Sequence, residues 1–113
     1  MEHNLDGLRM NATSTSANGV VNAETVFEFH QEGDAVWASY AGGFIQYGFL
    51  VGTIEGNALQ FKYCQRQNDG VLDGGSSVGE VQRNDGRTRI IERFDWASRE
   101  GGGENIFEEI DDT

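Results

Sequence analysis

Hydrophobic and polar residues alternate along most of this chain. Between residues 25 and 30, Thr25, Phe27 and Phe29 fall on one face of an extended segment, and the residues between them fall on the other. The same period of two runs through residues 36–40, 45–52, 59–64 and 90–96. Such alternation is typical of antiparallel β-strands with one buried face, whereas no window has a convincing amphipathic-helix pattern.

The segment between residues 45 and 52 is the most apolar of these. Alternation places Ile45, Tyr47, Phe49 and Val51 together on one face, while the other face carries Leu50 and two glycines. We therefore expect these four apolar side chains to share one side of a strand.

Glycine-containing turn signals separate the alternating segments. Asn-Gly and Asp-Gly pairs supply the positive φ angles that tight hairpin turns require, and the chain contains no proline. The signals include Asn18-Gly19, Gly33-Asp34, Gly56-Asn57, Asp69-Gly70 and Asp85-Gly86. Consecutive strands joined by short turns form a meander.

Together, these patterns predict eight strands. They cover about residues 7–16, 21–31, 35–41, 44–54, 58–68, 71–82, 87–97 and 104–110. A meander of eight strands closes most economically on itself, because closure removes the unpaired strand edges. We predict a single all-β domain over residues 1–113, an antiparallel meander that closes into a small calycin-like barrel of the avidin or lipocalin kind. A two-sheet sandwich is the alternative.

Composition supports a folded domain and excludes some partners. The 113 residues are 37% hydrophobic and 11% aromatic, which is enough for a core. Against 8 basic residues stand 19 acidic ones, a net charge of −11, so nucleic acids and anionic membranes are poor partners. The N-terminus shows no secretory signal, which predicts a soluble cytoplasmic protein, and we expect residues 1–6 and 111–113 to be loose ends.

Glu92 is the most informative polar residue. It falls on the face of Ile90, Phe94 and Trp96, which should point inward, and a buried carboxylate is costly unless it is hydrogen-bonded or paired. We expect Glu109 in the last strand to lie on the same side, so that the two carboxylates could serve acid–base chemistry or hold a cationic or hydroxyl-bearing ligand. In the simpler interpretation, Tyr40, Tyr63 or an arginine satisfies Glu92, which then fixes strand register.

Aromatic residues at inward positions suggest a pocket. A true pocket should bring the polar tips of Tyr40 and Tyr63 together with Glu92, with Trp96 in its wall. Aromatic residues at such positions are more often plain core. The candidate ligand-binding residues are Glu92, Tyr40, Tyr63, Trp96 and Glu109.

The sequence gives little support for a metal site or a reactive thiol. His3 and His30 lie far apart and form no metal-binding motif, so no metal is expected. A single cysteine, Cys64, excludes an internal disulfide and has no neighbouring histidine to activate it.

Several segments resemble a known family. The runs Phe29–Gly33, Val36–Gly43, Gly48–Thr53, Phe61–Tyr63, Asp85–Arg87 and Glu92–Trp96 are similar to those of small bacterial proteins of comparable length. The resemblance covers residues 20–110. Many of these proteins carry an automatic label of N-acetylglutamate synthase, but the resemblance brings no established activity and no functional residue.

That label implies a coenzyme A site, which the residues do not support. The nearest match to the phosphate-binding loop of acetyltransferases is residues 67–72, but it ends in Leu72 where a small residue is needed. No helix pattern follows, and Asp69 and Asp73 would repel phosphates. The segment is therefore interpreted as a hairpin turn, and no cofactor is expected.

Three functional hypotheses remain at this level. The barrel binds a small organic ligand in its interior or mouth, or it is an enzyme that uses Glu92, with or without Glu109, as acid or base. Alternatively, its core is filled and its surface forms a homo-oligomer or binds a partner.

Overall fold

Eight strands and no helix make up the described part of the molecule. The computed structural model describes residues 4–15, 20–98 and 100–110. The strands are β1 (Arg9–Thr15), β2 (Val26–Glu32), β3 (Ala35–Gly42), β4 (Ile45–Glu55), β5 (Ala58–Gln67), β6 (Leu72–Asn84), β7 (Arg87–Trp96) and β8 (Gly102–Glu109). No described element is a helix long and apolar enough to cross a membrane.

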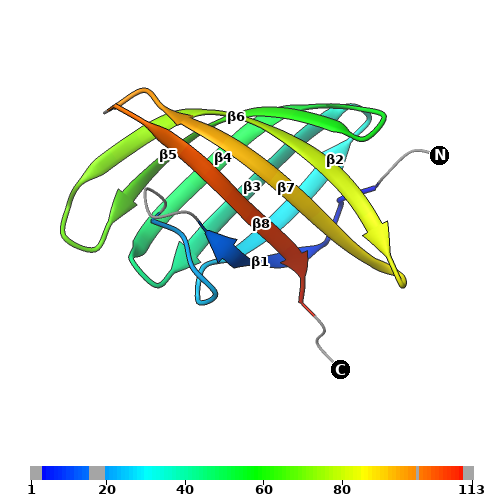
Figure 1. Cartoon of the computed structure of the whole chain (residues 1–113), viewed down its shortest axis with the longest axis horizontal. Coiled ribbons are helices and arrows are strands. Elements are labelled where there is room, and N and C mark those ends of the chain that lie inside the picture. The colour runs from blue at the N-terminus through cyan, green and yellow to red at the C-terminus, as the bar shows by residue number, and fades with distance from the viewer. Residues whose placement is uncertain (1–3, 16–19, 99, 111–113) are drawn as a thin grey trace.

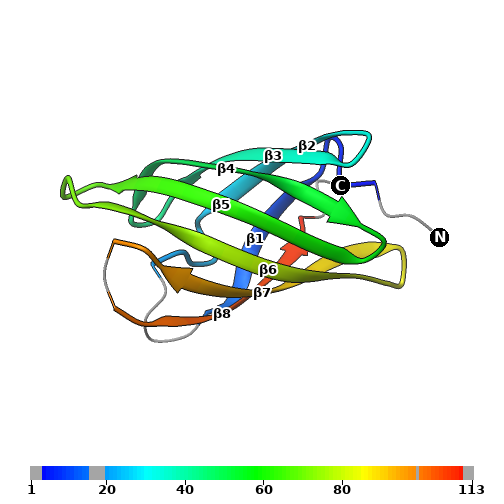
Figure 2. The same ribbon diagram turned by 90° about the horizontal axis from the view of Figure 1, so that it is seen from above.

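The strands form a closed barrel. Each strand pairs antiparallel with the next in the chain, and β8 pairs with β1 (Figures 1 and 2). This confirms the predicted meander barrel and excludes the sandwich. Because successive strands run in opposite directions, the β1–β2, β3–β4, β5–β6 and β7–β8 connections lie at one end, here called the mouth. The β2–β3, β4–β5 and β6–β7 turns lie at the other end, here called the base.

The turns at the base follow from their residues. Asn84 pairs with Arg87, so the β6–β7 turn consists of Asp85 and Gly86, with φ of 53° and 79°. Positive φ at both central residues is what a tight hairpin with the natural twist of β-strands requires, and Asp-Gly pairs adopt it readily.

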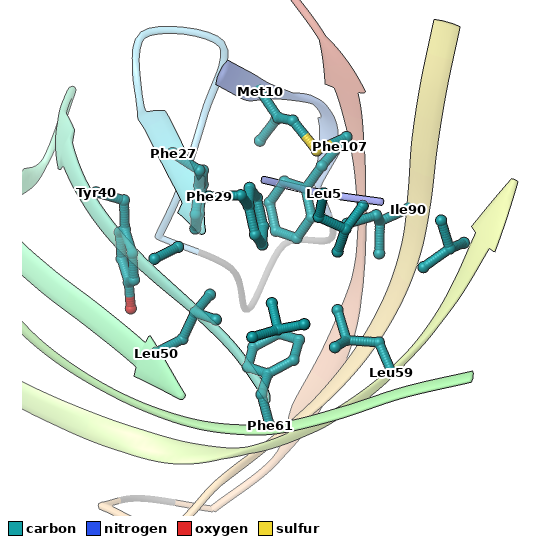
Figure 3. Packing of buried hydrophobic residues seen from close by; sticks show 14 of the residues in the cluster. Leu5, Met10, Phe27, Phe29, Tyr40, Leu50, Leu59, Phe61, Ile90 and Phe107 are labelled. Carbon is teal, nitrogen blue, oxygen red and sulfur yellow. The ribbon is translucent and has the colours of Figure 1, made fainter. Parts of the chain in front are cut away.

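Inward side chains fill the barrel with a continuous core. Phe27, Phe29 and Phe107 lie beside Leu5 and Ile90 within the ring of strands (Figure 3). This packing confirms the inward face that alternation predicts for β2 and β7.

The N-terminal segment plugs the base, which corrects the expectation that residues 1–6 are a loose end. Leu5 is completely buried in the core. Gly7 N–H donates to the carbonyl of Phe29, and Phe29 N–H donates to the carbonyl of Leu8, each at 2.9 Å. Residues 1–3 and 111–113 lie outside the described residues.

The predicted grouping on β4 holds for Tyr47, Phe49 and Val51, which share a face, and is wrong for Ile45. Ile45 is buried, but Tyr47, Phe49 and Val51 are exposed, whereas Leu50 points into the core. The β4–β5 register shifts between Ile45 and Tyr47, which indicates a bulge that moves the following residues to the opposite face. The second strand also begins later than predicted, at Val26 rather than near residue 21.

Candidate functional site

Glu92 lies inside the barrel on β7, at an inward position between Ile90 and Phe94. Only 4% of it is exposed. Its neighbours across the strands are Gly79 on β6 and Asn105 on β8. Ser77 lies two residues from Gly79 along β6, at an inward position, and is buried.

The carboxyl group of Glu92 accepts two hydrogen bonds. Ser77 Oγ donates to Oε2 at 2.6 Å, and Asn105 Nδ2 donates to Oε1 at 2.9 Å. Thr15 Oγ1 donates to Asn105 Oδ1, which orients the Asn105 amide with its nitrogen toward Glu92. Neither Ser77 nor Asn105 was among the predicted partners, because strand pairing is what brings them to this position.

The charge of Glu92 is not paired with a cation among the described residues. Burial raises the pKa of Glu92 above its usual value, and the hydrogen bonds from Ser77 and Asn105 lower it in part. Glu92 is a buried acid with two hydrogen-bond donors and, in the described part of the chain, no counter-ion. Its pKa therefore depends strongly on any polar group that is placed beside it.

Tyr40 approaches the same region from β3. Its ring stacks on Phe27 at 4.4 Å between centroids and passes over Gly48 of the neighbouring strand, where any Cβ would collide with it. Its hydroxyl donates to Gln65 Oε1 at 2.8 Å. Burial raises the pKa of the Tyr40 phenol, and the nearby Glu92 raises it further, so the hydroxyl remains a donor.

Gln65 is the residue that the sequence interpretation missed. It lies near the mouth end of β5 and is 5% exposed. Its Oε1 accepts from Tyr40, but its Nε2 has no hydrogen-bond partner among the described residues. The signal was available in the sequence, because Gln65 follows Leu59, Phe61 and Tyr63 at the same inward spacing of two.

Aromatic rings form the wall toward the mouth. Trp96 meets Phe94 at 5.2 Å and Tyr63 at 5.9 Å between ring centroids, both nearly edge to face. Tyr63 and Trp96 are only partly buried, so their rings extend from the interior to the surface of the molecule.

These groups surround one small interior cavity of about 20 Å³. Tyr40, Tyr63, Gln65, Glu92, Trp96 and Asn105 contribute to its lining, together with apolar side chains. Val20 and Val21, from the β1–β2 connection, cover it on the side of the mouth. The volume holds about one water molecule, so the interior is nearly full.

Four of the five predicted site residues therefore meet, and the fifth does not. Glu109 lies four residues beyond Asn105 on β8, about 13 Å farther toward the base at the usual rise of a strand. There its Oε1 accepts from the Thr88 N–H at 3.0 Å. Glu92 and Glu109 do not form a carboxylate pair.

Metal ligands do not gather in the described part of the chain. No group of three or more His, Cys, Asp or Glu side chains there is arranged to hold an ion.

Comparison with known proteins gives one match. The family described as avidin-like protein matches residues 3–110. No curated protein and no solved structure matches the chain.

Proposed function

We propose, since the chain belongs to the avidin-like family, that its barrel binds a small organic ligand at the mouth. Glu92 and Gln65 would contact the buried end of the ligand, while Tyr40 positions Gln65. Tyr63 and Trp96 would pack against the remainder. Glu109 is not included, because it lies near the base.

The observation that carries this proposal is that polar atoms at the cavity can form more hydrogen bonds than the protein gives them. Gln65 Nε2 is buried without a partner, and nearly all buried polar groups in proteins have one. Glu92 accepts one hydrogen bond on each oxygen, although a carboxylate oxygen can accept two. A purely structural core gains nothing from such groups, whereas a ligand site needs them free.

The size of the cavity limits how the ligand binds. About 20 Å³ admits a single head group and not a whole organic molecule. The rest of the ligand would lie between the rings of Tyr63 and Trp96 and the covering side chains Val20 and Val21. We therefore expect binding to displace these two valines.

A pair of matched variants tests the proposal. A broad thermal-shift screen of small organic compounds, followed by native mass spectrometry, should find compounds that stabilise the protein. Glu92→Gln keeps the shape of the side chain and should weaken binding of a hit about tenfold or more, because a hydrogen bond to a charged group is lost. Glu109→Gln makes the same chemical change at the base and should bind normally. A screen without any stabilising compound, or equal loss in both variants, would contradict the proposal.

We also propose that two copies of the chain associate through the outside of the barrel. The outer patch consists of exposed apolar side chains on β3, β4 and β6, which are 40–72% exposed: Trp37, Tyr47, Phe49, Val51 and Leu72. Part of it surrounds a surface hollow of about 430 Å³. Large exposed apolar patches are typical of interaction surfaces.

Charge favours a second copy as the partner. The neighbours of Tyr47, Phe49 and Val51 on the adjacent strands are Trp37, Ser39, Lys62, Cys64 and Arg66. None of them is acidic, in a chain with 19 acidic and 8 basic residues. Two copies with net charge −11 repel each other least when the parts of their surfaces with the fewest carboxylates meet. Glu28 and Asp73 line the hollows beside the outer patch, but neither is a strand neighbour of these three side chains.

Sedimentation velocity tests this association. Phe49→Glu introduces a charge at the centre of the patch and should shift the protein toward monomer. Thr13→Glu introduces the same charge on exposed β1, far around the barrel, and should leave the sedimentation coefficient unchanged. A wild-type protein that is monomeric at high micromolar concentration would contradict the association.

A further inference from the structure

We propose that the buried head group of the ligand is a hydroxyl, bound between Gln65 Nε2 and the carboxylate of Glu92. This inference rests on the proposed ligand binding and specifies its chemistry. Both residues line the same cavity, and each has unused hydrogen-bonding capacity of the opposite kind.

Space is the first constraint. A cavity of about 20 Å³ accommodates one non-hydrogen atom with its hydrogens. An amide or urea could satisfy both a donor and an acceptor, but it needs several atoms to do so. The head group must therefore donate and accept through a single atom.

Hydrogen-bond complementarity is the second constraint. Gln65 Nε2 offers an N–H and needs an acceptor, whereas each oxygen of Glu92 accepts one hydrogen bond and can accept another from a donor. A hydroxyl oxygen does both, because it accepts through a lone pair and donates its hydrogen. An ammonium group has no lone pair for Gln65. A carboxylate, or a phosphate without a proton, has no hydrogen to donate to Glu92.

The walls restrict the carbon skeleton that carries the hydroxyl. Phe94, Trp96 and Tyr63 meet nearly edge to face or tilted, so they offer apolar ring surfaces in several orientations. C–H groups of a compact ring pack well on such surfaces. The ligand class is therefore an alcohol on a compact, mainly saturated skeleton.

A series of cyclohexyl probes tests the head group on the wild-type protein, without requiring any variant to fold. Isothermal titration at neutral pH compares cyclohexanol, cyclohexylamine and methyl cyclohexyl ether, which share a ring and differ in the polar group. Cyclohexanol should bind at least about tenfold more tightly than the ether, since the ether cannot donate to Glu92 and its methyl group exceeds the space for one non-hydrogen atom. It should also bind more tightly than the amine, which cannot accept from Gln65.

One variant then tests whether the ligand hydroxyl accepts a hydrogen bond from Gln65. Gln65→Glu keeps an oxygen for the Tyr40 hydroxyl but removes the N–H, so it should abolish the preference for the alcohol over the amine. Glu109→Gln serves as the control and should keep the wild-type order of affinities.

The outcomes separate this inference from the function on which it rests. Tighter binding of the amine, or equal binding of alcohol and ether, would overturn the hydroxyl head group and leave ligand binding at the mouth intact. The same holds if none of the three probes binds while the broad screen finds a ligand without a hydroxyl. If neither the probes nor the screen finds a ligand, both proposals fail.

Discussion

At the scale of single residues, Glu92 is held by neutral donors rather than by a counter-ion. Ser77 and Asn105 each donate a hydrogen bond to its carboxyl group, but they cannot replace the solvation that a carboxylate has in water. Keeping such a group in the core costs stability whenever it is ionised. A fold that needed only a filled interior would be more stable with an uncharged residue at this position.

This leads to a prediction about pH. Because the pKa of Glu92 is higher in the folded than in the unfolded protein, the folded state binds the proton more tightly over the interval between the two values. The stability of the wild-type protein should therefore fall as the pH rises through that interval, as Glu92 loses its proton.

Glu92→Gln should remove this part of the pH dependence. The amide oxygen can accept from Asn105 while the amide nitrogen donates to Ser77 Oγ, so the site stays satisfied. Urea unfolding at about pH 5 and about pH 8 should show the variant gaining stability relative to wild type at the higher pH. Parallel pH profiles of the two proteins would show that the pKa of Glu92 is not raised in the folded protein, and would contradict the prediction.

At the scale of elements, the segment before β1 is not a strand, but it is as much a part of the core as the strands are. Leu5 closes the base, and the backbone around Gly7 and Leu8 bonds to Phe29 of β2. Leu8 packs against the same core but stays partly exposed. The two leucines are three residues apart and differ in burial.

Replacing each leucine by alanine should show that the loss of stability depends on how deeply the side chain is buried, not on its closeness to the N-terminus. Leu5→Ala should lower the free energy of unfolding by about 2–4 kcal/mol, because it leaves a void at a fully buried site. Leu8→Ala, a matched change at a partly exposed position, should cost about 1 kcal/mol or less. Chemical denaturation of the three proteins measures both values, and equal small effects would indicate that the N-terminal segment detaches before the barrel unfolds.

Alternation predicted the strands well because each strand of a barrel has one inner and one outer face. It failed where a local irregularity resets the phase, as the bulge after Ile45 does on β4. It also could not find Leu5, whose burial depends on contacts with strands far away in the chain. Within the site, inward polar residues such as Glu92 and Gln65 are visible from spacing alone. That Ser77 and Asn105 meet Glu92 follows from strand register, which one sequence does not determine.

At the scale of the whole molecule, the excess of negative charge opposes the compact state. With 19 acidic and 8 basic residues, the folded chain concentrates like charges that the unfolded chain can spread apart. Among the described residues an ion pair joins Arg93 and Glu104 at 3.5 Å, and both side chains are well exposed. Such a pair contributes little against the general repulsion.

Salt should therefore stabilise the protein. Raising NaCl from about 10 mM to about 150 mM shortens the range of charge repulsion to roughly 8 Å and should raise the melting temperature by a few degrees. Replacing the exposed Glu28 and Glu55 by lysine adds four positive units to −11, which gives −7. This variant should respond less to salt, and an undiminished response would mean that screening is not the cause.

The pairing of β1 with β8 also determines where the molecule can be attached to something else. Arg9 and Ile110 are joined by a backbone hydrogen bond of 2.8 Å at the base, so the first and last strands enter and leave the barrel side by side. A reporter or an immobilising linker joined there would face away from Trp96 and leave the opposite opening unobstructed. Because Leu5 closes the base, a peptide that connects the two ends must join Ile110 to the segment before Leu5, so that new termini could be cut at the Asp85-Gly86 hairpin.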